Sequence, residues 1–394
     1  RMIQAAGSAV MAPLLMNIML ISFPREKRGS VMGVFGLVMI TAPAIGPTLS
    51  GYIVQYYDWR FLFEMILPFA VLNLVLAIWK LKNVMPTKPA QIDILSIILS
   101  VIGFGGLLYG CSSASTEGWE NPLVIVTIAV GAVALVFFVI RQLKLKVPIL
   151  DLRVYRYPMF ALSSVISVVI AASMFSGMIL TPAYVQNVRG ISPLDSGLLM
   201  LPGALIMGVM SPITGRLFDR YGPRVLAFIG LSLTALSTYL LSLLEIDSGY
   251  FHIMSIYALR MFGMSMVMMP IMTNGLNQLP TRLNPHGTAL NNTIQQVAGS
   301  IGTAIFVTIM NSHAKSKAQE LLMTLDPTAV GPEKQAEIAQ QSLLAGIQFS
   351  FLVATGVTIV ALILTLFLKR VDVSADAVAK LEREGLDEAV PQRP

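Results

Sequence analysis

The sequence predicts an all-α membrane protein, and three observations support this fold class. Hydrophobic residues make up 55% of the 394 residues and charged residues only 12%, whereas soluble domains carry about 25% charged residues. The mean hydropathy is +0.73. The apolar residues form long unbroken runs rather than the alternating segments of about ten residues that are typical of membrane β-barrels.

A helix that crosses the apolar core of a bilayer, about 30 Å thick, needs about 20 mainly apolar residues. Runs of this length, bounded by charges, proline or glycine, recur along the chain. We therefore predict eleven spans, at residues 1–22, 29–55, 61–81, 92–113, 122–142, 158–187, 196–215, 223–244, 251–279, 287–311 and 343–368. The stretch 312–342 contains charges, Pro327 and Pro332, and is predicted to be a surface loop.

Lysine and arginine are divided unequally between the two sides of the predicted membrane. If successive loops alternate sides, most of the 27 basic residues fall on one side. The other side holds only Arg60, Arg189, Lys315, Lys317 and Lys334. The positive-inside rule places the basic side in the cytoplasm. Orientation therefore accounts for the net charge of +6, and nucleic acid is not an expected partner.

The chain is expected to be part of a longer protein. An odd number of spans that ends in the cytoplasm must begin outside, yet the first residue is Arg1, already within an apolar run. This run lacks the basic n-region and the small-residue cleavage site of a secretory signal, so we predict a membrane helix. The expected location is the bacterial inner membrane, with several passes through the lipid bilayer.

A weak internal repeat relates the first predicted span to the ninth and indicates two related halves. Arg1-Met2 recurs as Arg260-Met261, Pro13 as Pro270, Asn17 as Asn274, Pro24 as Pro280 and Gly29 as Gly287. If each half has six helices, the spans at 92–113 and 122–142 form an inserted hairpin and the whole protein has fourteen. The predicted parts are the fourth to sixth helices of the N-terminal half (1–82), the hairpin with its linkers (83–157), the C-terminal half (158–370) and a cytoplasmic tail (371–394).

Two motifs lie within the first two spans. Arg1-x-x-Gln4-x-x-Gly7 puts an arginine inside the membrane, where its charge is costly unless it faces a cavity or a carboxylate. In the second span, small residues at helical spacing allow close helix contact, and a proline bends the helix. These residues are Gly33, Gly46, Pro47 and Gly51, with Ala42 and Ser50 between them.

A third motif, Gly215-Arg216-Leu217-Phe218-Asp219-Arg220-Tyr221-Gly222-Pro223-Arg224, fills a cytoplasmic loop. Gly215 permits a close approach of two helices. Asp219 can accept hydrogen bonds from the N-terminus of a neighbouring helix, and Arg220 and Arg224 can form ion pairs across the loop. The alternative interpretation is a cluster of solvated charges.

Together these motifs resemble the fourteen-helix drug:proton antiporters of the major facilitator superfamily, the EmrB/QacA type, and are similar to the lincomycin-resistance branch. The resemblance covers the whole chain. It implies that Arg1, Gln4 and Gly7 belong to a proton-coupling motif, that the second-span glycines form an antiporter motif, and that the loop is a cytoplasmic gate. It also implies export of small amphipathic drugs by alternating access, driven by protons. A periplasmic adaptor is an expected partner only if the host has an outer membrane.

Polar residues inside the spans are candidates for the wall of a substrate cavity. They are Asn17, Glu64, Arg260, Asn274, Asn291 and Gln295. Asn291 and Gln295 are four residues apart and share a helix face, next to Asn292 and Gln296. Met264, Met266, Met268, Met269 and Met272 supply a flexible apolar surface. Helix packing is the alternative role of these residues, and Glu64 can equally lie at the outer interface.

Several classes of function find no support in the sequence. The single cysteine, Cys111, cannot form an intramolecular disulfide, and the three histidines are scattered, so no metal site is predicted. No cofactor is expected, and the chain has no Gly-rich nucleotide-binding loop. An exporter of an endogenous lipid, peptide or siderophore remains an alternative. A membrane-bound enzyme or a non-transporting regulatory protein fits less well, because no catalytic cluster is visible and the motifs are nearly intact.

Overall fold

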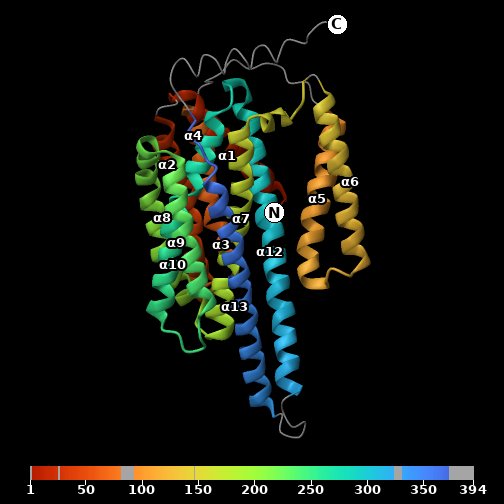
Figure 1. Ribbon diagram of the computed structural model, residues 1–394, viewed down its shortest axis with the longest axis vertical. Coiled ribbons are helices and arrows are strands. Elements are labelled where there is room, and N and C mark those ends of the chain that lie inside the picture. The colour runs from red at the N-terminus through yellow and green to blue at the C-terminus, as the bar shows by residue number, and fades with distance from the viewer. Residues whose placement is uncertain (1, 25–26, 81–92, 146, 324–330, 372–394) are drawn as a thin grey trace.

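The computed structural model describes residues 2–24, 27–80, 93–145, 147–323 and 331–371, and every regular element within these ranges is a helix (Figure 1). The elements are α1 (Met2–Ser22), α2 (Arg28–Tyr56), α3 (Phe61–Glu64), α4 (Ile66–Lys80), α5 (Ile94–Glu117), α6 (Pro122–Lys144), η2 (Leu152–Arg156), α7 (Pro158–Ala183), η3 (Tyr184–Val188), α8 (Pro193–Tyr221), α9 (Pro223–Ser242), α10 (Tyr250–Ser265), α11 (Met268–Asn277), η4 (Thr281–Leu283), α12 (Asn284–Met323) and α13 (Pro332–Thr365). The predicted all-α fold class is confirmed.

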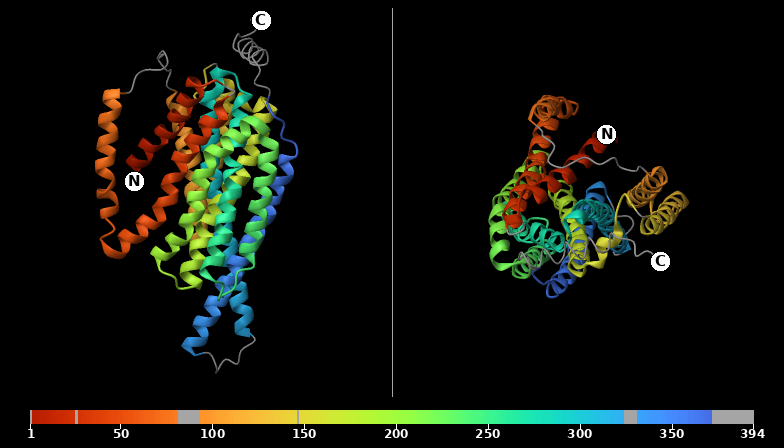
Figure 2. Two further views of the ribbon diagram at one scale, coloured as in Figure 1. Left: turned by 90° about the vertical axis from the view of Figure 1, so that its left-hand side faces the viewer. Right: turned by 90° about the horizontal axis from the view of Figure 1, so that it is seen from above.

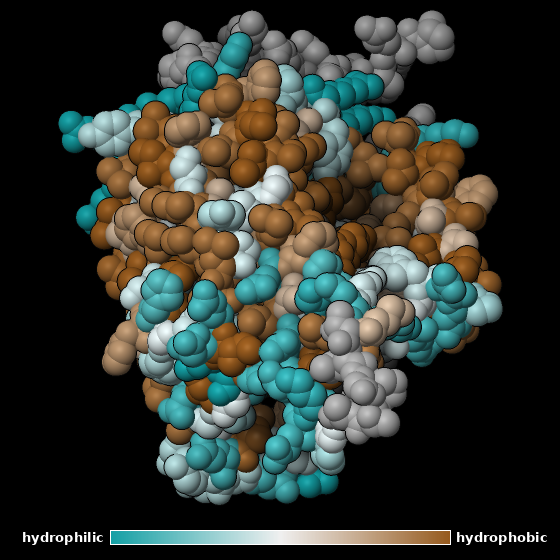
Figure 3. Space-filling model, turned by 60° about the horizontal axis from the view of Figure 1, so that its bottom comes forward, coloured by the Kyte–Doolittle hydropathy of each residue, from teal (hydrophilic) through white to brown (hydrophobic). Residues whose placement is uncertain are grey.

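The predicted spans coincide with these helices. Within the described ranges, 9 helical segments are long and apolar enough to cross a membrane, and α1 and α2 lie at the first two predicted spans. Apolar side chains cover the body of the molecule, and polar side chains gather on the end that faces the viewer in Figure 3. This distribution is the one expected of a multi-pass membrane protein.

Two spans are interrupted. The third span divides at Met65 into α3 and α4, and the ninth divides at Met266 and Val267 into α10 and α11. The sixth span ends differently, because α7 passes into the π-helical turn η3 just after Pro182. A proline lacks the N–H that continues the helical hydrogen bonds, and such turns are common near prolines and functional sites.

A bundle formed by α7 to α13 carries most of the buried core. In this bundle α7 contacts α11, α12 and α13, while α10 lies between α8 and α9. The long helix α2 runs antiparallel to α8 along its whole length. In contrast, α3 and α4 stand apart from the bundle (Figure 2), and none of their residues is buried.

The hairpin of α5 and α6 stands beside the bundle and reaches it through α12 (Figure 1). Its two helices approach closely because glycine lies where they cross. A Cβ on Gly106 would lie 2.9 Å from the carbonyl oxygen of Thr127. At the outer end, Trp119 donates its indole N–H to Thr308 of α12 at 2.9 Å. Division of the chain at 83–157 and 158–370 stays a prediction.

The segment predicted as a surface loop is largely helical, so that prediction was wrong. Helix α12 continues to Met323 and α13 begins at Pro332, and both project beyond the rest of the molecule (Figures 1 and 2). The 40 residues of α12 extend about 60 Å, twice the thickness of the bilayer core. Pro332 does not break α13, because it occupies the first helical turn, where proline is tolerated.

Arg260 joins three helices in the core of the bundle. Its side chain is fully buried, donates from Nε to Thr238 Oγ1 of α9 at 3.2 Å and donates from Nη2 to the carbonyl oxygen of Ser173 of α7 at 2.5 Å. Gly177 of α7 packs directly against the guanidinium, and an added Cβ would overlap Nη1. The glycine at position 177 therefore makes room for the arginine.

This packing predicts the effect of Gly177→Ala. The added methyl group would displace the guanidinium and lower the stability of the bundle by about 1–3 kcal/mol, as overpacked cores do. Gly356→Ala is the matched control, because Gly356 is also helical and a Cβ there has no neighbour within 4 Å. Thermal unfolding midpoints in detergent should fall for the first variant and hold or rise for the second. Equal midpoints for the two variants would contradict the packing role of Gly177.

Candidate functional site

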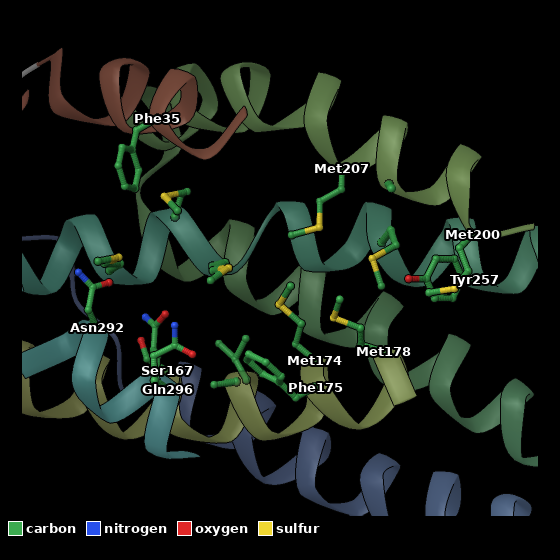
Figure 4. A pocket seen from close by; sticks show the side chains of 18 residues that line it. Phe35, Ser167, Met174, Phe175, Met178, Met200, Met207, Tyr257, Asn292 and Gln296 are labelled. Carbon is green, nitrogen blue, oxygen red and sulfur yellow. The ribbon is translucent and has the colours of Figure 1, made fainter. Parts of the chain in front are cut away.

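A cavity of about 260 Å³ lies among α2, α7, α8, α10, α11 and α12 (Figure 4). Its volume is close to the lower end of the range of about 300–1,000 Å³ that is usual for small-molecule sites. Apolar and thioether side chains form most of the wall: Phe35, Ile170, Ala171, Met174, Phe175, Met178, Met200, Ala204, Met207, Met261, Met268, Met269 and Met272. The remaining lining residues are Ser167, Tyr257, Asn292, Gln295 and Gln296.

Most of the polar side chains gather at one end of this cavity, and the Tyr257 hydroxyl lies toward the other (Figure 4). Ser167, Asn292 and Gln296 lie toward one end in Figure 4, and Met200 and Tyr257 toward the other. Ser167 and Asn292 stand near the starts of α7 and α12, on the side of the basic loops, so the polar end lies on the side predicted to be cytoplasmic. None of the described lining residues carries a charge. The cavity therefore suits a molecule with one hydrogen-bonding face and one apolar face.

Asn292 offers a free hydrogen-bond donor at the polar end. Its Nδ2 is buried and has no acceptor among the described residues. A buried N–H without a partner is costly, so a water or a bound molecule is needed to accept this hydrogen bond. Residues 292, 295 and 296 are spaced by three and four positions, which places their amides on one face of α12.

The candidate cavity residues are only partly brought together. Gln295 lines the cavity, but Asn291 does not: it is buried on another side of α12. Arg260 lies behind the wall formed by its neighbours Tyr257 and Met261. Glu64 is exposed at the end of α3 and does not line the cavity. The side chain of Asn17 lies outside the described residues.

Asn274 has a different role from the predicted one. Its Nδ2 donates to the carbonyl oxygen of Lys369 at 3.1 Å, and its Oδ1 accepts from the backbone N–H of Val371 at 3.2 Å. The amide therefore fastens the chain just after α13 to the end of α11. The candidate role of Asn274 in the cavity is corrected accordingly, because both ends of its side chain are used by backbone groups.

Of the five methionines singled out in the sequence, Met268, Met269 and Met272 line the cavity. Met264 and Met266 pack in the hydrophobic core instead. Sequence reasoning missed Phe35, Ser167 and Tyr257, which come from helices far apart in the chain. Only the meeting of α2, α7 and α10 in space reveals them.

The contact between α2 and α8 forms one wall beside the cavity and depends on glycines, which have no side chain to hold the helices apart. A Cβ on Gly33 would lie 2.7 Å from the carbonyl oxygen of Ser211 and 2.9 Å from Cα of Pro212. At the other end of α2, a Cβ on Gly51 would lie 3.0 Å from the carbonyl oxygen of Pro193. Gly46 differs, since a Cβ there meets no described atom within 4 Å, and the side chain of Pro47 is outside the described part.

The start of α2 and the end of α8, on the side predicted to be cytoplasmic, are joined through Asp219. Its Oδ2 accepts hydrogen bonds from the backbone N–H of Ser30 at 3.0 Å and from Ser30 Oγ at 2.8 Å. Ser30 lies in the first turn of α2, where N–H groups lack helical partners and the helix dipole favours a negative charge. Asp219 therefore caps a helix of the other half of the chain.

The rest of the loop motif closes the end of α8. Gly222 has φ +78°, the left-handed backbone conformation that glycine adopts easily at a helix C-terminus. Arg370 lies against Gly222 and donates to the carbonyl oxygens of Asp219 at 2.6 Å and Arg220 at 3.3 Å. A cation at the negative end of a helix dipole stabilises that end. This role of Arg370 had no signal in the motif itself.

The two arginines of the loop are arranged differently from the predicted ion pairs. Arg220 and Arg224 are exposed, and neither forms an ion pair with the described residues. The guanidinium of Arg220 instead lies 5.3 Å from the ring centre of Tyr221. Gly215 is buried in α8.

The fourth-helix motif is described only in part. Arg1 lies outside the described residues. Gln4 and Gly7 lie on an exposed part of α1, and a Cβ on Gly7 would meet nothing within 4 Å. No group of three or more potential metal ligands occurs within the ranges that the structure describes.

Comparison with known proteins places this architecture in a family. The Major Facilitator Superfamily model matches residues 1–303. The uncharacterised MFS-type transporter YhcA of Bacillus subtilis (strain 168) is 43% identical over 414 residues, which cover 98% of this chain and 77% of that protein. The lincomycin resistance protein LmrB of Listeria monocytogenes is 42% identical over 370 residues, which cover 94% of this chain and 76% of that protein.

A more distant relative is the tetracenomycin C resistance and export protein of Streptomyces glaucescens. It is 26% identical over 399 residues, covering 94% of this chain and 74% of that protein. Both the extent of the family match and the identity to the Bacillus and Listeria proteins agree with the multi-pass helical fold and with transport rather than catalysis. The chain belongs to the Major Facilitator Superfamily of membrane transporters.

Proposed function

We propose that this protein exports small amphipathic drugs from the bacterial cytoplasm in exchange for protons, by alternating access. The observation that carries the proposal is the cavity of about 260 Å³ with amides at its cytoplasmic end and methionines along its walls. Thioether side chains adapt to apolar molecules of different shape. The names of the Listeria and Streptomyces relatives, which refer to antibiotic resistance, support a drug as the substrate.

The cycle that we propose uses the seam between α2 and α8. Close contact at Gly33 and the cap of Asp219 on α2 hold the cytoplasmic ends together, which corresponds to a state closed on that side. Separation of these ends opens the cavity to the cytoplasm. Each contact is small, so that the two states can differ by only a few kcal/mol and exchange during transport.

Proton coupling is assigned to the fourth-helix motif, Arg1, Gln4 and Gly7, by resemblance. A guanidinium within the membrane changes the pKa of a nearby carboxylate and can release a proton when a substrate approaches. We also propose that the whole protein has fourteen helices, as the resemblance to the fourteen-helix antiporters implies. The chain spans about three quarters of the length of YhcA and of the Listeria lincomycin resistance protein, and α4 presents no buried residue in the described structure.

Efflux measurements test the proposal. Cells of a drug-sensitive bacterium that express the full-length protein should accumulate less lincomycin or fluorescent amphipathic dye than control cells, and an uncoupler should abolish the difference. Gln296→Leu removes a polar group from the cavity and should reduce efflux about tenfold, the effect of losing about 1.4 kcal/mol of binding. Asn311→Leu, which alters an exposed amide further along α12, should leave it unchanged. Uncoupler-resistant efflux would disprove proton coupling.

Asp219→Asn tests the cytoplasmic gate. The substitution keeps the size of the side chain but removes the charge that accepts two hydrogen bonds from Ser30, and hydrogen bonds to charged groups contribute about 1.5–3 kcal/mol. A loss of about 1.4 kcal/mol changes the ratio of the two states tenfold. A cysteine placed in the cavity wall should then react faster with a maleimide added from the cytoplasm. Asp247→Asn, in an exposed outer loop, should change nothing, and the same rate for both variants would refute the gate.

The glycines of the second span make a paired test of the seam. Gly33→Ala places a methyl group against the backbone of Ser211 and should impair efflux, because overpacking costs about 1–3 kcal/mol in the closed state. Gly46→Ala meets no described neighbour and should transport normally. We therefore propose that Gly33, rather than Gly46, is the sensitive position of the seam. Efflux is compared at equal amounts of inserted protein, and a more severe effect at Gly46 would contradict this assignment.

A further inference from the structure

A second hollow in the protein lies on the inserted hairpin, away from the candidate substrate cavity. It is a groove of about 410 Å³ between the start of α5 and the end of α6. The lining residues are Leu95, Leu99, Phe137, Ile140, Arg141, Lys144 and Leu145. The groove is thus apolar along its length and cationic at one end.

The apolar part of the groove faces outward. Leu95 is 49% exposed, Phe137 58% and Ile140 43%. In a membrane protein, exposed side chains of this kind at the level of a spanning helix contact lipid chains rather than water. The groove is therefore shaped by residues that already lie in the hydrocarbon region.

The cationic end has hydrogen-bond donors to spare. Arg141 uses Nε and Nη2 to bind Asp93, at 2.8 and 2.9 Å, and its Nη1 has no hydrogen-bond partner among the described residues. The hydrogen bonds from Arg141 and from Ser96 hold the pKa of the Asp93 carboxyl well below its usual range, so Asp93 stays ionised and fixes the guanidinium in place. Lys144 is exposed and forms no ion pair within the described ranges. The net charge of this trio is positive.

The surroundings add to this positive charge. The short helix η2, which follows α6 in the chain, carries Arg153 and Arg156. By the positive-inside rule these residues lie at the cytoplasmic surface, where the leaflet is rich in anionic lipid. Basic pockets between membrane helices on this side bind lipid headgroups, and each Lys or Arg near the surface adds to the attraction.

We propose that the groove between α5 and α6 is a binding site for one anionic phospholipid of the cytoplasmic leaflet. One acyl chain lies along Leu95, Leu99, Phe137 and Ile140, and the headgroup phosphate contacts Lys144 and the free edge of Arg141. The lipid fills the face of the hairpin and links it to the membrane surface. A zwitterionic lipid binds less well, because its ammonium group approaches Lys144 and the basic flanking chain.

Photo-crosslinking of the full-length protein in nanodiscs tests this site. The discs contain phosphatidylcholine with a small fraction of phosphatidylglycerol that carries a diazirine on its acyl chain, and labelled peptides are located by mass spectrometry. We expect labelling of the α5 and α6 peptides. Lys144→Gln should reduce this labelling about fivefold, the change that one cationic contact with an anionic membrane surface supplies. Lys80→Gln, at the cytoplasmic end of α4, is the matched control and should have no effect.

A second pair of variants tests the apolar part. Leu99→Trp fills the groove and should reduce labelling, whereas Leu74→Trp, on the exposed face of α4, should not. Phosphatidylcholine carrying the same diazirine serves as the lipid control, and inorganic phosphate in the buffer should not compete with the labelled lipid. The proposal is overturned if both lipids label the hairpin equally, or if Lys144→Gln and Lys80→Gln behave alike. These outcomes are independent of transport, so they leave the proposed function untouched.

Discussion

Close contact between α2 and α8 is the constraint on which the rest of the arrangement depends. Lipid offers no hydrophobic drive for helices to associate, so association relies on van der Waals contact and on hydrogen bonds between helices. Gly33, Gly36 and Gly51 remove the side chains that would hold the two helices apart. The same approach brings Ser211 Oγ to the carbonyl oxygen of Gly33 at 2.9 Å and Asp219 to Ser30. The cavity lies where α2 turns Phe35 toward α7 and α12.

Buried polar side chains fix the helices of the C-terminal bundle relative to one another. Arg260 connects α10 with α7 and α9, and Asn274 connects α11 with the chain that follows α13. In both cases the partners include backbone carbonyl oxygens, which every helix can supply. These hydrogen bonds cross-link the helices of the bundle, and in the transport cycle that we propose the movement falls on the seam with α2.

The sequence was a sufficient guide to the helices but not to the cavity. The thickness of the bilayer sets the length of a span, so hydropathy alone located the eleven helical regions. Prediction of the cavity would have required knowing which face of each helix points inward. Asn291 and Asn292 are neighbours in sequence, yet only Asn292 reaches the cavity, because successive residues of a helix point about 100° apart. Phe35, Ser167 and Tyr257 belong to helices far apart in the chain, and only their packing shows that they meet.

The repeat also had a limited reach. Asn17 and Asn274 occupy equivalent positions of the repeat, and both were candidates for the cavity wall, but the amide of Asn274 is held by Lys369 and Val371. A repeat preserves the position of a residue on its helix, whereas its hydrogen-bond partners depend on which neighbouring segment packs against that helix. The prediction of a surface loop around Pro332 was wrong because the effect of a proline depends on its position. Proline breaks a helix from within but is tolerated in the first turn.

The unbroken helix α12 connects the wall of the cavity to the outer tip of the molecule. From Gln296, on the cavity wall, the helix continues to Met323, a length of about 40 Å at 1.5 Å per residue. The outer part is braced by α13, where His313 stacks on Phe349 at 4.3 Å. Because the helix is unbroken, any tilt of α12 about its cavity end would displace the outer tip further than it displaces Gln296.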